Sequence, residues 1–150
     1  MEGQNYHTTI RVSADAMEAF GKITHVSGWW TADFEGSSQQ INDHFRIRFG
    51  ETHVDFTVIE SIPGRKQVWL VTDCNLHWLK DKNEWKGTKM SFEILPEGDF
   101  TEIKATHIGL IPAIECYADC KKGWDFFIRE SLFKYLTEGK GMPETPKFSR

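Results

Sequence analysis

Cysteine is scarce in this 150-residue chain, and the three residues present are an odd number. An odd count does not suit the disulfide framework of a small secreted domain, so we expect reduced thiols and a cytoplasmic location. The chain also lacks an apolar run near the roughly 18 residues that a membrane span needs. Its first residues show no basic segment followed by an apolar one, so the sequence predicts neither a signal peptide nor a membrane partner.

Clusters of basic residues are missing as well. The 18 Lys and Arg are spread along the chain and are outnumbered by 22 Asp and Glu, whereas a nucleic-acid-binding surface needs clustered positive charge. No Gly-x-Ser-x-Gly, Walker or dinucleotide-binding motif is present. We therefore predict no nucleic-acid partner, no cofactor and no catalytic residue of a known motif.

Patterns of metal ligands are incomplete. Cys116 and Cys120 lie four residues apart, but no Cys-x-x-Cys or His-x-x-x-His motif supplies further ligands. These two cysteines and Cys74 are predicted to be buried free thiols, and no metal site is expected. Asp33 and Glu35 are two residues apart, which places both on one face of a strand, where we interpret them as solvated surface acids.

Aromatic side chains, in contrast, are abundant: the chain has 11 Phe and 6 Trp, and aromatic residues make up 13% of it. Its length suits one domain with a single core. We predict that this domain spans residues 1–141. The Gly, Pro and charged residues of the last segment predict a flexible tail over residues 142–150.

The first part of the chain predicts one strand and two small helices. Residues 5–12 alternate and are rich in β-branched side chains, which indicates a strand. Ser13 is a candidate N-cap for a helix over residues 14–23, whose apolar positions follow helical spacing. The segment HVSGWWTADFEG then predicts a second short helix, a turn and a brief strand near Phe34.

Alternating segments separated by turn signals follow, which is typical of an antiparallel sheet. The turn signals are the Pro-Gly pair in IPGRK and the segment PEGD. One face of this sheet is expected to carry a row of apolar side chains and one histidine: Phe45, Ile47, Phe49, Val54, Phe56, Val58, Met90, Phe92, Ile94, Ile103, Ala105 and His107.

A long helix is predicted over residues 114–138, with Gly139 and Gly141 as its stop. Residues at spacings of three and four form one broad apolar stripe along it. The stripe consists of Tyr117, Cys120, Trp124, Phe127, Ile128, Ser131, Leu132 and Tyr135. We therefore predict an α+β fold in which a curved antiparallel sheet wraps around the long C-terminal helix and leaves an aromatic-lined chamber.

This arrangement resembles the helix-grip fold of the START-like (SRPBCC) superfamily. Within it, the chain is similar to the C-terminal domain of the heat-shock-protein-90 ATPase activator over about residues 5–141. The similarity rests on VSADAMEAF, GWW, WKGTKMSFEI, ATHIGL and GWDFFIRESLFKYLTEGKG, in this order. The resemblance implies a ligand-binding or stress-response protein, in a superfamily whose activities are diverse.

Our leading hypothesis is a monomer that binds a small hydrophobic or amphipathic molecule between sheet and helix. Trp29 and Trp30 either stack on a flat ligand or pack the short helix against the sheet. The predicted walls of the chamber comprise Trp29, Trp30, Phe45, Ile47, Phe56, Phe92, Ile103, His107, Tyr117, Trp124, Phe127 and Ser131.

Two alternative functions stay open. Phe126 and Phe133 are expected on one exposed side of the helix, and together with Arg46 and Arg48 they would form the surface of a chaperone-associated interaction module. His107 is alternatively the base of a cyclase- or hydrolase-like enzyme, or a core histidine bonded to a backbone carbonyl. A second titratable group beside the His107 ring would favour the enzyme.

Overall fold

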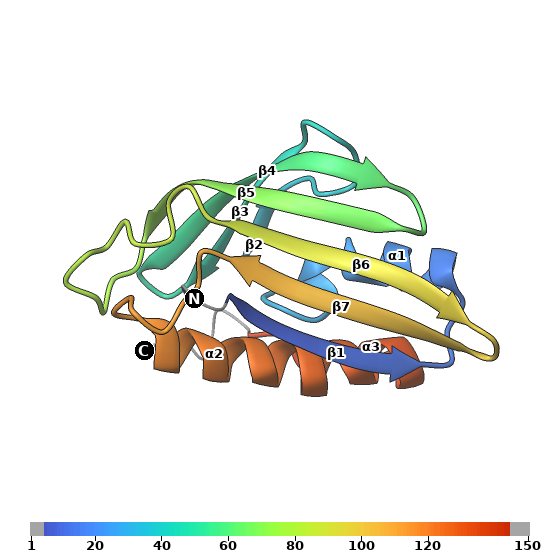
Figure 1. Ribbon diagram of the computed structural model, residues 1–150. Helices are drawn as coiled ribbons and strands as arrows, with labels where there is room; N and C mark the ends of the chain where they lie inside the picture. Colours follow the sequence, from blue (N-terminus) through green and yellow to red (C-terminus); the bar gives the residue numbers. More distant parts are fainter. Residues whose placement is uncertain (1–4, 145–150) are drawn as a thin grey trace.

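Residues 5–144 are described in a computed structural model of the chain. Seven antiparallel strands form one sheet in the order β1-β7-β6-β5-β4-β3-β2 (Figure 1). The predicted first strand, the brief strand near Phe34 and the antiparallel meander are confirmed. The strands are β1 Tyr6–Val12, β2 Phe34–Gly36, β3 His44–Phe49, β4 Thr52–Ile62, β5 Lys66–Asn75, β6 Lys89–Glu97 and β7 Phe100–Ile108.

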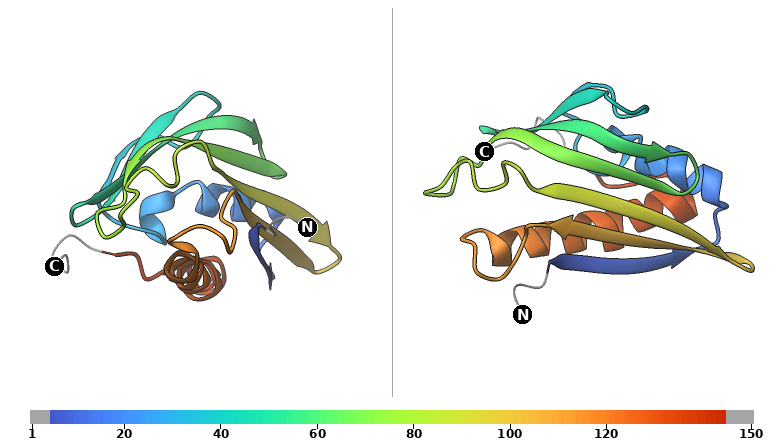
Figure 2. Two further views of the ribbon diagram at one scale, coloured as in Figure 1. Left: turned by 60° about the vertical axis from the view of Figure 1, so that its left-hand side comes forward. Right: turned by 45° about the horizontal axis from the view of Figure 1, so that its top comes forward.

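The sheet is strongly curved and arches over the C-terminal helix (Figure 2). The register between β4 and β5 shifts twice, between Asp55 and Phe56 and again between Val58 and Glu60. Such irregularities bend a strand and increase its twist, which helps the two longest strands to follow the curve. The predicted arrangement, a curved antiparallel sheet around a long C-terminal helix, is confirmed.

The concave face of the sheet carries the side chains that the alternation predicts. Those of β6 and β7 are at most 1% exposed, and those of β3 and β4 are buried as well, except for the half-buried Phe49. Removing each large apolar side chain from water contributes roughly 1.5–3 kcal/mol. The buried residues of this face are Phe45, Ile47, Val54, Phe56, Val58, Met90, Phe92, Ile94, Ile103, Ala105 and His107.

The C-terminal helix begins at Tyr117, three residues later than predicted. A distant loop determines this start: the Glu84 carboxylate accepts hydrogen bonds from the backbone N–H groups of Glu115 (2.7 Å) and Cys116 (2.9 Å). Backbone N–H groups at the beginning of a helix have no partner within the helix, and a carboxylate there also interacts favourably with the helix dipole.

The helix is not α-helical throughout. It comprises α2 Tyr117–Phe126, the π-helical segment η2 Phe127–Leu132 and α3 Phe133–Glu138. It ends as predicted at Gly139, which adopts the left-handed conformation (φ 82°) that glycine accepts without strain. In the part of the chain that the structure describes, no helix combines the length and the apolar character needed to cross a membrane.

The two small helices differ in detail from the prediction. Helix α1 spans Ala16–Ile23, and its cap is Asp15 rather than Ser13. The Asp15 carboxylate accepts a hydrogen bond from the backbone N–H of Glu18 at 2.8 Å, the usual geometry of an N-cap. The predicted second helix is a single 3₁₀ turn, η1 Val26–Gly28.

The end of the described chain returns to the domain after the helix. The backbone N–H of Glu144 donates to the carbonyl of Trp30 at 2.9 Å, and the Glu144 carbonyl accepts from the N–H of Ala32 at 2.7 Å. The N–H of Met142 donates to Ser131 Oγ at 2.7 Å. Residues 142–144, which we expected in the tail, therefore pack on the domain, while residues 145–150 lie outside the described residues.

Candidate functional site

A pocket of about 150 Å³ opens between the sheet and the start of the C-terminal helix. Strands β3 and β4, the segment that joins β5 to β6, helix α2 and Trp30 supply its walls. Most wall residues are apolar, which is typical of a small-molecule site. An apolar cavity of about this volume holds one benzene molecule. The walls are Trp30, Ile47, Phe49, Thr52, Val54, Leu76, Trp78, Trp85, Asp119, Cys120, Gly123, Trp124 and Phe127.

Tryptophan side chains fill much of the space beside this pocket. Trp30 lies in the middle, with ring centroids 4.7 Å from Trp124, 6.1 Å from Trp29 and 6.2 Å from Trp69. Trp85 stacks on Trp124 at 6.0 Å, with the two ring planes 9° apart. These five indoles form one connected group under the sheet, so the chamber that the fold creates is reduced to a small pocket.

Four of the predicted wall residues line this pocket, namely Trp30, Ile47, Trp124 and Phe127. Five others lie in the packed core outside its walls, and Tyr117 is half-buried against that core. The five are Trp29, Phe45, Phe56, Phe92 and Ile103. Phe92 shows why no space remains there, since its ring lies 5.9 Å from Trp29 and 5.1 Å from Trp69.

Sequence reasoning missed two helix residues that complete the walls, Asp119 and Gly123. Both precede the predicted wall residue Phe127 at spacings of four, so the three share one helix face, and all three line the pocket. The sequence contains this spacing, but the apolar stripe alone does not show that a glycine and a carboxylate lie beside it. Trp78 and Trp85, from the segment between β5 and β6, line the pocket as well.

Ser131 holds backbone segments together and is not part of the pocket wall. Its hydroxyl donates to the carbonyl of Trp29 at 2.6 Å and accepts the N–H of Met142 at 2.7 Å. The Trp29 indole N–H in turn donates to the carbonyl of Ile23 at 3.0 Å. Ser131 therefore joins the helix to η1 and to the returning chain end, and its hydroxyl already has a donor and an acceptor partner.

His107 is a neutral core residue with both ring nitrogens bonded. The Trp124 indole N–H donates to Nδ1 at 3.0 Å. Because an indole N–H can only donate, the ring proton lies on Nε2, which donates to Thr88 Oγ1 at 2.9 Å. The Thr88 hydroxyl then donates to the Trp85 carbonyl at 2.6 Å. The bond partners are thus an indole and a hydroxyl rather than the backbone carbonyl that we considered.

This network argues against His107 as a catalytic base. Burial lowers the pKa of His107 to about 3, and the side chain is only 1% exposed. The lone pair of Nδ1 is already engaged by Trp124, so the ring has none left for a substrate proton. Within the described residues, no carboxylate is bonded to the ring.

The cysteines are free and buried, as predicted. The Trp85 indole N–H donates to Cys116 Sγ at 3.2 Å. The hydrogen bond with Cys116 and burial raise the pKa of Cys120. Cys120 therefore presents a protonated, weakly nucleophilic thiol to the pocket.

The π-helical segment changes the placement of Phe126 and Phe133. A π-helix has more residues per turn than an α-helix, so residues beyond it are rotated about the axis, and the α-helical spacing of seven no longer places these two on one side. Phe133 lies in a groove with Thr9 and Arg11 of β1, whereas the ring of Phe126 packs against Phe127 at 4.9 Å. Phe133 is 37% exposed and Phe126 is 42% exposed.

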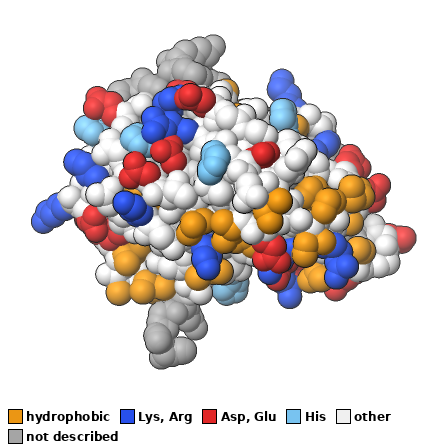
Figure 3. All heavy atoms as spheres, turned by 90° about the horizontal axis from the view of Figure 1, so that it is seen from above, with side chains coloured by type: hydrophobic (Ala, Val, Ile, Leu, Met, Phe, Trp, Pro, Cys, Tyr) orange, Lys and Arg blue, Asp and Glu red, His pale blue; other side chains and the backbone are white. Residues whose placement is uncertain are grey.

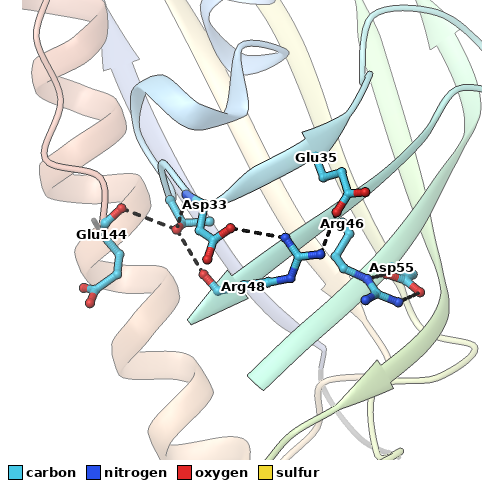
Figure 4. Close-up of polar contacts among 7 residues, drawn as sticks. Asp33, Glu35, Arg46, Arg48, Asp55 and Glu144 are labelled. Carbon is cyan, nitrogen blue, oxygen red and sulfur yellow. Dashed lines mark hydrogen bonds and ion pairs between the residues drawn. The ribbon is translucent and has the colours of Figure 1, made fainter. Parts of the chain in front are cut away.

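Charged side chains line the outer face of β2 and β3 (Figure 4). Arg48 donates to Asp33 Oδ1 at 3.2 Å and to Glu35 Oε1 at 2.6 Å, so the two acids do share one face. Each of these pairs is open to solvent, where an ion pair stabilises by roughly 0–1 kcal/mol. The positive charge of Arg48 is thereby balanced within the domain.

Arg46 is paired in the same way. Its Nη2 donates to Asp55 Oδ2 at 3.0 Å, and this guanidinium holds the pKa of Asp55 below its usual range. His53 and Asp73 lie close enough to Asp55 for the three to share a metal ion, but Arg46 already satisfies the Asp55 carboxylate. Neither arginine is available to an acidic partner unless an internal pair breaks.

The outer face of the sheet divides into two regions (Figure 3). Charged and histidine side chains gather over β2, β3 and β4, and hydrophobic side chains gather toward the β4–β5 and β6–β7 turns. Ile62, Leu95 and Phe100 near these turns are 46%, 40% and 50% exposed. The polar region coincides with the ion pairs of Arg46 and Arg48, whereas near the turns charged side chains, such as Arg11 and Glu97, are interspersed with the hydrophobic ones.

Comparison with protein-family models and with the sequences of curated proteins gives no match. Among solved structures, the chain is similar to the Aha1 dimer from Colwellia psychrerythraea, with 25% identity and a TM-score of 0.76 over 92% of this chain and 99% of that one. It is also similar to DynU16 of the dynemicin biosynthetic locus, with 17% identity and a TM-score of 0.71 over 91% of this chain.

The chain spans about half of DynU16, since the match covers 48% of that protein. A third similar structure is CalU16 from Micromonospora echinospora, with 12% identity and a TM-score of 0.64 over 85% of this chain and 73% of that one. The protein therefore has the helix-grip fold of SRPBCC proteins, as the sequence resemblance implied. A shared fold does not by itself define an activity.

Proposed function

We propose that this protein binds a small, largely apolar molecule of about one aromatic ring in the pocket between β3, β4 and α2. The observation that carries the proposal is a pocket of about 150 Å³ whose walls include the rings of Trp30, Trp124 and Phe127. The helix-grip fold supports it, because a curved sheet over a helix creates such a space. A guest of this size gains affinity mainly by leaving water, at roughly 25 cal/mol per Å² of buried apolar area.

The small volume sets the expected affinity. A one-ring molecule has few atoms with which to gain binding energy, so we expect a dissociation constant of about 1 mM, which corresponds to roughly 4 kcal/mol. Benzyl alcohol is a suitable neutral probe. Binding should shift the indole N–H resonances of Trp85 and Trp124 in a saturable way, because both side chains line the pocket.

A variant that fills the pocket tests this proposal. Gly123 lines the pocket, and a Cβ atom at this position meets no atom within 4 Å, so Gly123→Leu should fold and occupy the space of the guest. Gly21→Leu is the matched control, because Gly21 lies on the exposed surface of α1 with equally open surroundings. Benzyl alcohol should bind the Gly21→Leu variant normally and should not bind the Gly123→Leu variant.

Either of two results would contradict the proposal. One is the absence of any saturable shift in the unmodified protein. The other is a shift that persists unchanged in Gly123→Leu, since the probe would then bind outside the pocket.

A chaperone-associated interaction module is the second candidate function. The observation that favours it is the similarity to an Aha1 protein, at 25% identity over 92% of this chain. The contacts would be the exposed rings of Phe126 and Phe133, which the π-helical segment places on different sides of the helix. Arg46 and Arg48 contribute less than we expected, because both are paired with acidic side chains of the same domain.

Sedimentation with purified heat-shock protein 90 tests this second function. The double variant Phe126→Ser/Phe133→Ser should lose co-sedimentation, and the control double variant Met17→Ser/Ile41→Ser, at residues 60% and 53% exposed, should keep it. Equal behaviour of the two variants would contradict the assigned surface. The same runs measure the mass of the free protein, which decides between the monomer that we predict and a dimer such as the Colwellia protein forms.

A further inference from the structure

Asp119 gives the pocket a single charge. Among its wall residues, Asp119 is the only one with a charged side chain, and the wall includes no Lys, Arg or His. Asp119 lies in the first turn of α2. Among the described residues, no cation is paired with it, in contrast to Asp125 on the same helix, which accepts hydrogen bonds from Tyr6 (2.8 Å) and Lys121 (3.1 Å).

Trp78 adds an exposed aromatic side chain to the same pocket. Its side chain is 49% exposed, whereas the other tryptophans of the wall, Trp30 and Trp85 among them, are at most 6% exposed. Asp119 is also exposed, so Trp78 and Asp119 are the two most exposed side chains of the wall, whose other residues are half-buried or buried. An indole face attracts cations more strongly than the other aromatic rings do, and a carboxylate adds direct attraction.

We propose that the pocket selects an organic cation, namely a compact apolar ring that carries an ammonium group. The ring would lie inside, between Trp124 and Phe127, and the ammonium group would lie at the opening between Asp119 and Trp78. This inference rests on the proposed function, because it assigns the ligand class of the same pocket. It predicts that charge, and not size or ring chemistry alone, decides which guests bind.

Three probes of equal ring size and different charge test the proposal: benzylammonium, benzyl alcohol and benzoate. An exposed cation–π contact and an exposed ion pair each contribute modestly, so benzylammonium should bind about five-fold more tightly than benzyl alcohol. Benzoate should bind more weakly than benzyl alcohol, because its charge has the same sign as Asp119. The shifts of the Trp85 and Trp124 indole N–H resonances measure all three affinities.

The variant Asp119→Asn tests whether the Asp119 carboxylate causes the preference for a cationic guest. It should lose most of the preference for benzylammonium over benzyl alcohol, while Glu130→Gln, on the same helix but outside the pocket, should keep that preference. In the unmodified protein, added salt should reduce the ratio of the affinities for benzylammonium and benzyl alcohol, since salt screens exposed charges.

The results separate the two proposals. If none of the probes shifts the indole resonances, the binding function itself is refuted. If benzyl alcohol binds and benzylammonium binds no more tightly, only the preference for cations is refuted. If the preference survives in Asp119→Asn, or is lost equally in Glu130→Gln, the role assigned to Asp119 is refuted.

Discussion

The two ends of the space under the sheet contain the same kinds of aromatic side chain, yet one is filled and the other holds a pocket. At the filled end, Phe92 packs against Trp29 and Trp69 and is 0% exposed. At the pocket end, Phe127 is only half-buried and lines the open space. Aromatic content therefore does not determine where a cavity forms.

The two ends differ in packing because different segments of the chain cover them. Trp29 at the filled end follows α1 and η1, and it is bonded both to Ile23 of α1 and to Ser131 of the helix. The pocket end is covered by the irregular segment between β5 and β6, from which Trp85 reaches inward and Trp78 remains exposed. Close packing needs elements on every side, and the pocket end has an irregular segment where the filled end has helices.

Truncation of one phenylalanine at each end should give the largest contrast in stability. Phe92→Ala leaves a cavity in a closely packed region and should lower the free energy of unfolding by about 3–5 kcal/mol. Phe127→Ala removes a half-buried ring beside an existing opening and should cost about 1–2 kcal/mol. Urea denaturation of the two variants measures the difference, and equal losses would show that the two ends are packed alike.

His107 should give the next largest effect, and it depends on pH. The pKa of His107 is lowered from 6.5 to about 3 by burial, so between these values the unfolded chain binds a proton that the folded protein does not. The contribution of His107 to the free energy of unfolding is therefore fully present above pH 6.5. It falls as the pH decreases toward 3, by about 1.4 kcal/mol per pH unit. From pH 7.5 to pH 5.0, the loss from this residue should be about 2 kcal/mol.

The variant His107→Leu isolates that contribution. It should lose about 1–3 kcal/mol at pH 7.5, because the buried indole N–H of Trp124 is left without an acceptor. Its stability should then change less between pH 7.5 and pH 5.0 than that of the unmodified protein. Parallel pH dependence in the two proteins, measured by urea denaturation, would rule out a neutral buried imidazole.

Two glycines should show the smallest effect, with opposite signs. Gly123→Ala adds a methyl group in open space within a helix and should raise the free energy of unfolding by about 0.5–1 kcal/mol. Gly28→Ala should destabilise the protein, because its Cβ atom would lie 2.5 Å from the Tyr135 ring. Thermal unfolding measures both, and a destabilised Gly123→Ala variant would mean that the space beside α2 is not open.

Local patterns predicted much of the fold, because they report local physics. Alternation placed Phe92 and Ile103 on the concave face, and both are 0% exposed. Helical spacing placed Trp124 and Ile128 on the buried stripe, and Gly139 ended the helix as expected. Each of these predictions depends on neighbours within a few residues, where the period of a strand or helix decides which side is apolar.

The candidate site was predicted less completely, because it depends on contacts between distant segments. The helix starts where Glu84 accepts the N–H groups of Glu115 and Cys116, about 30 residues away in the chain. Trp85 became part of the core by stacking on Trp124. The π-helical segment, which separates Phe126 from Phe133, has no signature that we recognised in the sequence.

By itself, the amino-acid sequence determined the class of fold, the buried face of each strand and helix, and the free state of the thiols. These follow from the period of the apolar side chains and from composition. Only the tertiary structure decided that indoles fill most of the chamber, that His107 has no free lone pair and that Asp119 faces the remaining pocket. The reason is that cavities and charge environments arise from side chains that meet across the fold, and no local pattern encodes the volume left between them.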